Sequence, residues 1–102
     1  MSQFAIYPSL AGRPVFITGG ASGIGAGLVA AFARQQAVVH FVDIDAAASQ
    51  ALVTHLHAES CAYRVSFDHC DIRDVAALQR SIHHFEANQG PIRVLVNNAA
   101  ND

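Results

Sequence analysis

Three groups of residues in this 102-residue chain have the types and spacing needed to bind a nucleotide. The first is the glycine-rich run Gly19-Gly20-Ala21-Ser22-Gly23-Ile24-Gly25, which follows an apolar run and precedes a helix-like segment. Glycine permits a tight turn with positive φ and lets backbone N–H groups approach a pyrophosphate. A helix N-terminus adds about half a positive charge. Taken alone, the glycines are equally consistent with a turn that binds no ligand.

The second group is centred on Asp43, which follows Gly25 by 18 residues at the end of the apolar run 38–42. A carboxylate in this position accepts hydrogen bonds from the adenosine ribose hydroxyls. It also repels a 2′-phosphate, by about 4 kcal/mol at a separation of about 4 Å and an effective dielectric of about 20. No Arg or Lys lies in the glycine run or beside Asp43, and Asp45 adds negative charge. These charges predict NAD rather than NADP as the cofactor.

The third group consists of two short segments that follow later strands. Asp71-Ile72 follows an expected strand within residues 63–70, and there Asp71 either accepts from an adenine amino group or is a turn residue. Asn97-Asn98-Ala99-Ala100 follows an expected strand at 93–96. Both would lie at the carboxyl edge of a parallel sheet, where ligands bind in such folds.

The elements that must position these groups alternate as β-α-β-α-β-α-β. Strands are predicted at 14–18, 38–42, within 63–70 and at 93–96, with helices at 22–35, 46–58 and from 75 to Gly90-Pro91. Asp45 and Asp74 are the expected N-caps, and Gly90 the expected left-handed helix stop. In the first helix, small residues allow close approach to the sheet (Gly23, Ala26, Gly27 and Ala30), while Leu28, Val29 and Phe32 supply packing volume. Apolar stripes define the inner faces of the other two helices: Ala48, Leu52 and Leu56; Val75, Leu78, Ile82 and Phe85. The pattern predicts an α/β, Rossmann-type doubly wound parallel sheet in the order 3-2-1-4.

Composition restricts the function classes. The chain is 52% hydrophobic and 14% charged with a net charge of −2, and all six of its basic residues are Arg. These values predict a globular protein and argue against nucleic acid or an anionic membrane as partner. We see no signal peptide and no membrane span, and we read Cys61 and Cys70 as reduced thiols, so a cytoplasmic location is expected.

Other ligand classes fit less well. A P-loop needs Lys after its last glycine, where this chain has Ala26. The pairs His55/His57 and His83/His84 do not face one another on a helix and lack further ligands, so no metal site is expected. An S-adenosylmethionine-binding methyltransferase remains a distant alternative, although such proteins commonly carry an acidic residue where this chain has Thr18.

Together, Thr18-Gly19-x3-Gly23-x-Gly25, Asp43, Asp71 and Asn97-Asn98-Ala99-Ala100 resemble the short-chain dehydrogenase/reductase superfamily. The resemblance implies three groups of cofactor contacts and a structural role for Asn97 in the central sheet. Ala100 departs from the Gly that is usual in the family. The implied cofactor contacts are Gly19, Ser22, Gly23, Ile24 and Gly25 around the pyrophosphate; Asp43 with Ile44 at the adenosine ribose and Asp71 with Ile72 beside the adenine; and Asn98, Ala99 and Ala100 near the other ribose.

A narrower likeness is carried by residues 5–10, 22–28 and 97–102, which resemble bacterial xylose-type aldose 1-dehydrogenases. It implies oxidation of an alcohol or sugar, such as an aldose to its lactone, with NAD, by a homo-oligomer (a dimer or tetramer). The family's catalytic Ser and Tyr-x-x-x-Lys are not found here, because Tyr7 and Tyr63 are followed at the fourth position by Ala11 and Phe67.

We therefore expect residues 1–102 to be the NAD-binding N-terminal half of a longer dehydrogenase, with the catalytic C-terminal half absent. The expected strand at 93–96 supports this interpretation, since it should be central in the sheet but here forms an edge. A non-catalytic dinucleotide-binding or sensing module is the alternative from another functional class.

Overall fold

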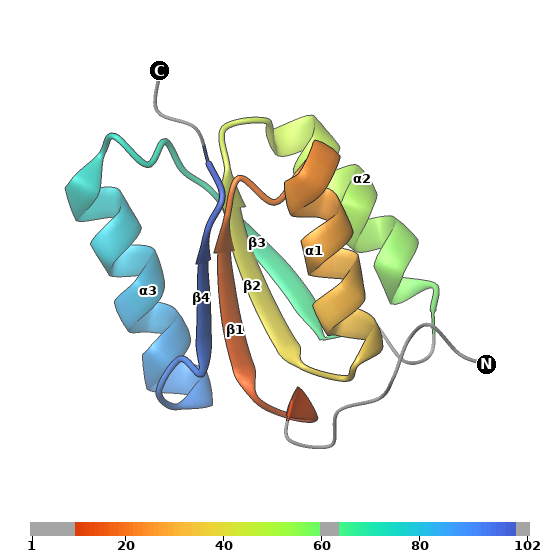
Figure 1. Ribbon diagram of the computed structural model, residues 1–102. Coiled ribbons are helices and arrows are strands. Elements are labelled where there is room, and N and C mark those ends of the chain that lie inside the picture. The colour runs from red at the N-terminus through yellow and green to blue at the C-terminus, as the bar shows by residue number, and fades with distance from the viewer. Residues whose placement is uncertain (1–9, 60–63, 100–102) are drawn as a thin grey trace.

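The computed structural model describes residues 10–59 and 64–99, and it shows one parallel sheet flanked by helices (Figure 1). Predictions that concern Tyr7, Cys61, Tyr63 and Ala100 lie outside these residues. The elements alternate as predicted: β1 (Pro14–Thr18), α1 (Gly23–Arg34), β2 (Val38–Asp43), α2 (Ala46–His57), β3 (Val65–His69), α3 (Val75–Gln89) and β4 (Val94–Asn97). The sheet order is β3-β2-β1-β4, which confirms the Rossmann-type topology.

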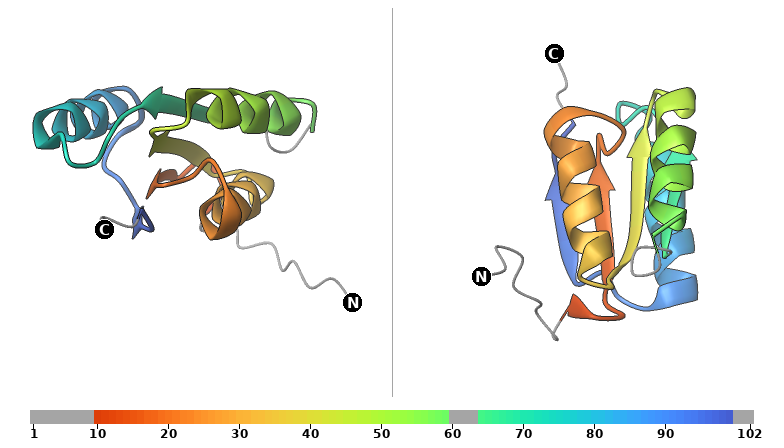
Figure 2. Two further views of the ribbon diagram at one scale, coloured as in Figure 1. Left: turned by 90° about the horizontal axis from the view of Figure 1, so that it is seen from above. Right: turned by 90° about the vertical axis from the view of Figure 1, so that its right-hand side faces the viewer.

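Helices cover both faces of the sheet. Helices α1 and α2 lie against one face and α3 lies against the other, as the view from above shows (Figure 2). Strand β1 is buried throughout, and its alternating side chains contribute to two separate cores. Val15 and Ile17 pack on the α1 and α2 side, whereas Phe16 packs on the α3 side against Phe85. Apolar burial on both faces explains the near-continuous hydrophobic sequence of this strand.

Three predicted packing faces differ in detail from those observed. In α1 the predicted packing residues are confirmed, since Val29 is buried and Leu28 and Phe32 pack against the core. Gly25 and Ala33 are buried as well, while Gly27 faces open space rather than the sheet. In α2 Leu56 is buried as predicted, and Ala48 and Leu52 are partly buried against the core, but Ser49 and Val53 are the other buried residues. Ser49 can be buried since its Oγ donates to the carbonyl of Asp45 at 2.7 Å.

The third difference is in α3, where Val75 is 59% exposed and lies outside the core. Ser81 and Phe85 are the buried residues of this helix. The predicted caps are confirmed, since Asp45 and Asp74 accept from the backbone N–H groups of Ala48 and Ala77.

Gly90 ends α3 with a positive φ, as expected, but its backbone is not left-handed helical. Its φ of 91° and ψ of −178° belong to a region that is essentially restricted to glycine.

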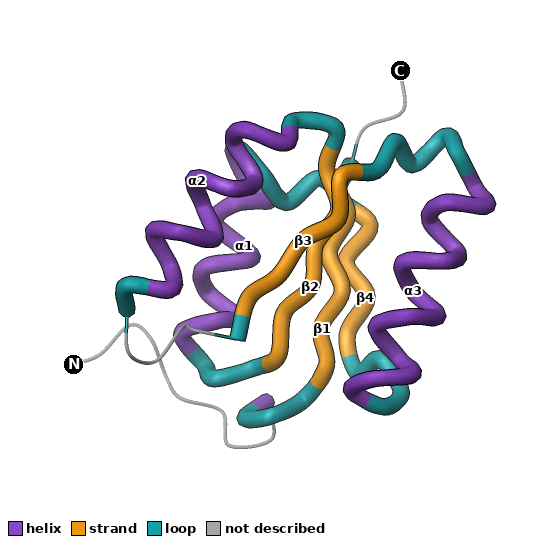
Figure 3. Tube along the Cα trace, turned by 180° about the vertical axis from the view of Figure 1, so that it is seen from behind, coloured by secondary structure: helices purple, strands orange, loops and turns teal. Residues whose placement is uncertain are grey.

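All four strands run in the same direction, so their carboxyl ends meet at one edge of the sheet (Figure 3). Strand β4 is the last strand of the described sheet: it pairs only with β1 there, and its Leu95 side chain is 59% exposed. None of the helices in the described ranges, 10–59 and 64–99, has the length and apolar character needed to cross a membrane.

Candidate nucleotide-binding site

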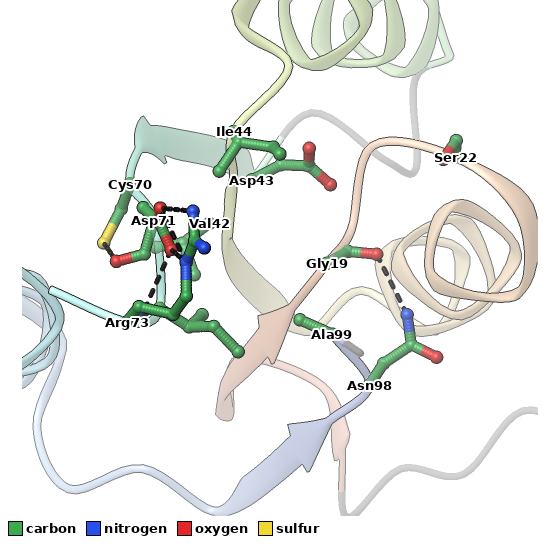
Figure 4. A pocket seen from close by; sticks show the side chains of 11 residues that line it. Gly19, Ser22, Val42, Asp43, Ile44, Cys70, Asp71, Arg73, Asn98 and Ala99 are labelled. Carbon is green, nitrogen blue, oxygen red and sulfur yellow. Dashed lines mark hydrogen bonds and ion pairs between the residues drawn. The ribbon is translucent and has the colours of Figure 1, made fainter. Parts of the chain in front are cut away.

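A pocket of about 420 Å³ lies at the carboxyl edge of the sheet, between the loops that follow the four strands (Figure 4). Val42, Cys70 and Arg73 line it without having been predicted from the sequence. Eight predicted residues line it: Gly19, Ser22, Asp43, Ile44, Asp71, Ile72, Asn98 and Ala99. The topology thus brings together segments that are up to 80 residues apart in the chain, as in the hydrogen bond from Asn98 to Thr18.

The glycine run has its shape because a Cβ at Gly19, Gly20 or Gly25 would lie closer than 3.0 Å to neighbouring atoms, and at Gly20 it would meet the ring of Phe41 at 2.7 Å. Gly19 and Gly23 have φ values of 69° and 57°, which disfavour other residues. A Cβ on Gly19 would lie 2.9 Å from the Cα of Ala99. A Cβ on Gly25 would collide with the carbonyl oxygen of Gly19 and lie 2.7 Å from Nδ2 of Asn98. The glycines therefore allow the first turn of α1 to pack against both loops.

The N-terminus of α1 has the electrostatic character of an anion-binding site. Ser22 is its N-cap but makes no side-chain capping bond, and the first turn contains no acidic residue. The positive end of the helix is thus not neutralised from within its own first turn. Together with the glycine cradle, this arrangement fits a pyrophosphate group.

Asp43 connects the end of β2 to the glycine run. Its Oδ2 accepts from the backbone N–H of Ala21 at 3.0 Å, and its Oδ1 accepts from the N–H of Asp45 at 2.9 Å. An ionised carboxylate offers about four acceptor positions. This half-buried carboxylate can therefore hold the loop and still accept from two ribose hydroxyls.

Thr18 joins the two loops that form the sides of the pocket, a role that we did not predict. Its buried hydroxyl donates to Oδ1 of Asn97 at 3.1 Å and accepts from the N–H groups of Asn98 and Ala99 at 3.0 and 3.1 Å. Asn98 in turn donates through Nδ2 to the carbonyl of Gly19 at 3.0 Å. The role of Thr18 could have been found from the strand register, because Thr18 lies opposite Asn97 when β1 and β4 are paired.

Asp71 and Arg73 form an ion pair on the side of the pocket opposite Gly19 and Asn98 (Figure 4). The hydrogen bonds from the Arg73 side chain and backbone lower the pKa of Asp71 from 3.8 to about 2. Arg73 is thus a cationic residue of the pocket, although no Arg or Lys lies in the glycine run or beside Asp43 in the sequence. Cys70 lies beside this pair, and burial, followed by the nearby carboxylates, raises the pKa of its thiol.

A second polar cluster lies away from this pocket, beneath α3. Nδ1 of the buried His40 is 2.7 Å from Oγ of Ser66, and its Nε2 is 3.0 Å from Oδ2 of Asp68. Ser81 of α3 donates to the same carboxylate oxygen at 2.6 Å. Burial lowers the pKa of His40, which favours a neutral ring that donates from Nε2 to Asp68.

The remaining histidines do not assemble a metal site in the structure. Across residues 10–59 and 64–99, no group of three His, Cys, Asp or Glu side chains is arranged to hold a metal ion. His57, for example, contacts the carbonyl oxygen of Val65 at 2.9 Å.

Comparison with known proteins gives one consistent result. A family model described as "short chain dehydrogenase" matches residues 13–101. The chain is 48% identical over 96 residues to the probable galactose dehydrogenase GalD of Rhizobium meliloti, covering 94% of this chain and 37% of that protein. It is 47% identical over 98 residues to D-xylose 1-dehydrogenase of Caulobacter vibrioides, covering 96% and 37%.

Solved structures agree with the sequence relatives. A double mutant of a short-chain dehydrogenase/reductase from Serratia marcescens superimposes with a TM-score of 0.82 and 31% identity, covering 94% of this chain and 38% of that one. The chain therefore spans little more than a third of the length of these relatives. The methyltransferase alternative receives no support from these matches.

Proposed function

The chain belongs to the short-chain dehydrogenase family, and on this basis we propose that the protein is an NAD-dependent oxidoreductase that oxidises a hydroxyl group of a sugar or related alcohol. The resemblance to a galactose dehydrogenase and a D-xylose 1-dehydrogenase supports an aldose as substrate and a lactone as product. Nicotinamide cofactors supply the chemistry by accepting a hydride from the carbon that bears the hydroxyl.

The observation that carries this proposal is the pocket in which the glycine run faces Asp43 across the ends of β1 and β2. Gly19, Ser22, Gly23, Ile24 and Gly25 would surround the pyrophosphate at the N-terminus of α1. Asp43 and Ile44 would hold the adenosine ribose, and Asp71 and Ile72 would flank the adenine. Asn98, Ala99 and Ala100 would approach the second ribose.

The preference for NAD over NADP rests on charge. Asp43 would lie close to the 2′-position of the ribose, where a phosphate would be repelled. Arg73 is the one cationic side chain among the described residues that line the pocket, and its charge is already paired with Asp71. The lining residues thus offer no uncompensated positive charge to a 2′-phosphate.

Proton removal from the substrate hydroxyl depends on residues outside these 102 in our proposal, because the family's Tyr-x-x-x-Lys is not among them. We also propose that the intact protein forms a homo-oligomer, a dimer or a tetramer. A cytoplasmic location is consistent with the free thiol of Cys70.

The test is NAD⁺ reduction by the full-length protein, which in this proposal carries the residues for proton removal. D-xylose, D-galactose and simple alcohols are the substrates, and the absorbance of the reduced nicotinamide is measured. We expect turnover with at least one aldose and NAD⁺, and slower turnover with NADP⁺. NAD⁺ binding without turnover of any alcohol or sugar would favour the alternative, a dinucleotide-sensing module. Absence of NAD⁺ binding would refute the proposed cofactor.

A further inference from the structure

Three side chains of β2 and β3 form a hydrogen-bonded row beneath α3, away from the nucleotide pocket. Ser66 lies opposite His40 in the register of the two parallel strands, and Asp68 follows two residues later on the same face of β3. Oγ of Ser66 is 2.7 Å from Nδ1 of His40, and Oδ2 of Asp68 is 3.0 Å from Nε2 of the same ring. A hydroxyl, an imidazole and a carboxylate are thus joined in the order found in serine nucleophile sites.

The hydrogen bonds determine which ring nitrogen of His40 carries the proton. Burial raises the pKa of Asp68, but bonds from Ser81, at 2.6 Å, and from His40 outweigh it, so this carboxyl is ionised at neutral pH. An ionised carboxylate only accepts, which places the proton on Nε2 and leaves Nδ1 as an acceptor. Burial lowers the pKa of His40 and keeps the ring neutral. Nδ1 can therefore take the proton of the Ser66 hydroxyl.

The imidazole is held in place, whereas the hydroxyl is accessible. His40 is only 8% exposed, and its ring stacks on that of Phe85 with the centroids 5.3 Å apart. Ser66 is exposed, and both residues line a groove of about 640 Å³ formed mainly by β2, β3 and α3. Val38 and Phe85 give this groove an apolar part, and it shares no lining residue with the nucleotide pocket. A fixed base beside an accessible hydroxyl fits a small ester.

The position of β3 also provides a backbone donor next to this hydroxyl. Within residues 10–59 and 64–99, β3 is the outer strand of the sheet and pairs only with β2 (Figure 3). The carbonyl of Arg64 accepts from the N–H of Val39 on β2 at 2.8 Å, whereas that of Val65 contacts Nε2 of His57 at 2.9 Å. Backbone groups alternate in direction along a strand, so the N–H of Phe67 points away from β2. The N–H of the residue after a nucleophile is a common donor to an oxyanion.

We propose that Ser66 is a nucleophile for acyl transfer from small esters, with His40 as its general base and Asp68 as the residue that positions the base. Oγ of Ser66 attacks the ester carbonyl carbon, and its proton moves to Nδ1 of His40. The bond from that carbon to the alcohol oxygen then breaks, and the alcohol leaves with the proton. Water hydrolyses the acyl-serine in the same way, which releases the carboxylic acid and restores the hydroxyl. This reaction is separate from hydride transfer.

The experiment uses p-nitrophenyl acetate as the probe and the full-length protein. We expect release of nitrophenolate, and mass spectrometry should find an acetyl group on the peptide that contains Ser66. Ser66→Ala should lower the rate by at least about 10-fold, since general base catalysis contributes about 10²–10⁴-fold. His84→Gln is the matched control, because His84 lines the same groove but bonds to Asn88, and it should retain the wild-type rate.

Two further variants test the base and its positioning. His40→Gln, shown by its melting temperature to be folded, should lose as much activity as Ser66→Ala. Asp68→Asn should lower kcat without raising KM, because Asp68 contacts the imidazole and not the ester.

Wild-type hydrolysis by Ser66→Ala, or acetylation confined to other residues, would overturn the inference and leave these side chains as a packing network. A folded His40→Gln variant that is acetylated at Ser66 at the wild-type rate would also overturn it. NAD⁺ reduction by Ser66→Ala should match that of the wild type, so these results are independent of the proposed dehydrogenase activity.

Discussion

Replacing Thr18 by Val should separate the two loops of the pocket without changing the shape of β1 greatly. The hydroxyl makes three hydrogen bonds, to Asn97, Asn98 and Ala99, and each contributes about 0.5–1.5 kcal/mol net. Their sum is about 1.5–4.5 kcal/mol. Because Asn98 and Ala99 are only half-buried, water can satisfy part of what is lost. We expect the free energy of unfolding to fall by about 2–3 kcal/mol.

Thr18→Ser is the matched control, since it retains the hydroxyl and removes a buried methyl group worth about 1 kcal/mol. Denaturant unfolding of both variants gives the comparison, and calorimetric titration with NAD⁺ reports the geometry of the loops. Thr18→Val should lose more stability and more NAD⁺ affinity than Thr18→Ser. A loss in Thr18→Ser that equals or exceeds the loss in Thr18→Val would contradict this account, because the hydroxyl bridge would then contribute no more than the methyl packing.

Two further predictions concern the glycine run and the buried histidine. Gly25→Ala should abolish NAD⁺ binding and lower the free energy of unfolding by about 1–3 kcal/mol or more, because the added Cβ collides with Gly19. Gly27→Ala is the control: its Cβ would face open space, and it should stabilise α1 by about 0.5–1 kcal/mol. Equal melting temperatures for the two variants would contradict this packing. His40 has a folded pKa that burial holds below its ordinary value of 6.5, so the unfolded state binds the proton first and stability should fall as the pH drops below about 6.5. Burial raises the pKa of Asp68, but hydrogen bonds from Ser81 and His40 outweigh it and the pKa is lowered. Further stability is therefore lost as the pH falls below about 3.8 and this carboxylate is protonated. His40→Gln should flatten the melting temperature between about pH 5 and 7, at an ionic strength of about 0.1 M, and a curve parallel to that of the wild type would refute this assignment.

The sheet order and most of the pocket-lining residues could be predicted from the sequence. Each helix and strand has a local sequence pattern, and the alternation of strands and helices then implies the order of the parallel sheet. Continuous apolar strands, acidic N-caps and a glycine turn identified the elements, and a parallel sheet necessarily brings their carboxyl ends together. Asp43 and Asn98 could therefore be placed in one pocket from the order of the elements alone. The inner faces of the helices were less accurate, since a buried Ser49 bonded to its own helix looks polar in a periodicity argument.

The residues that were missed act through side-chain pairs that depend on register or on loop direction. His40 can be buried because both of its ring nitrogens have partners: Ser66 lies opposite it on β3, and Asp68 lies two residues further along the same face. Thr18 acts because its partner is Asn97. Arg73 enters the pocket because Asp71 turns it there within a three-residue segment. None of these pairings is visible in composition or hydrophobic periodicity.

The most direct test of the nucleotide site is a parallel calorimetric titration of the protein with NAD⁺ and NADP⁺ at an ionic strength of about 0.1 M, where charge effects are only partly screened. We expect NAD⁺ to bind about tenfold more tightly or better, which corresponds to about 1.4 kcal/mol, well within the repulsion available between Asp43 and a 2′-phosphate. Asp43→Asn, which removes the charge and retains one acceptor oxygen, should narrow that ratio. Equal or tighter binding of NADP⁺, or no binding of either dinucleotide, would contradict the assignment of this pocket.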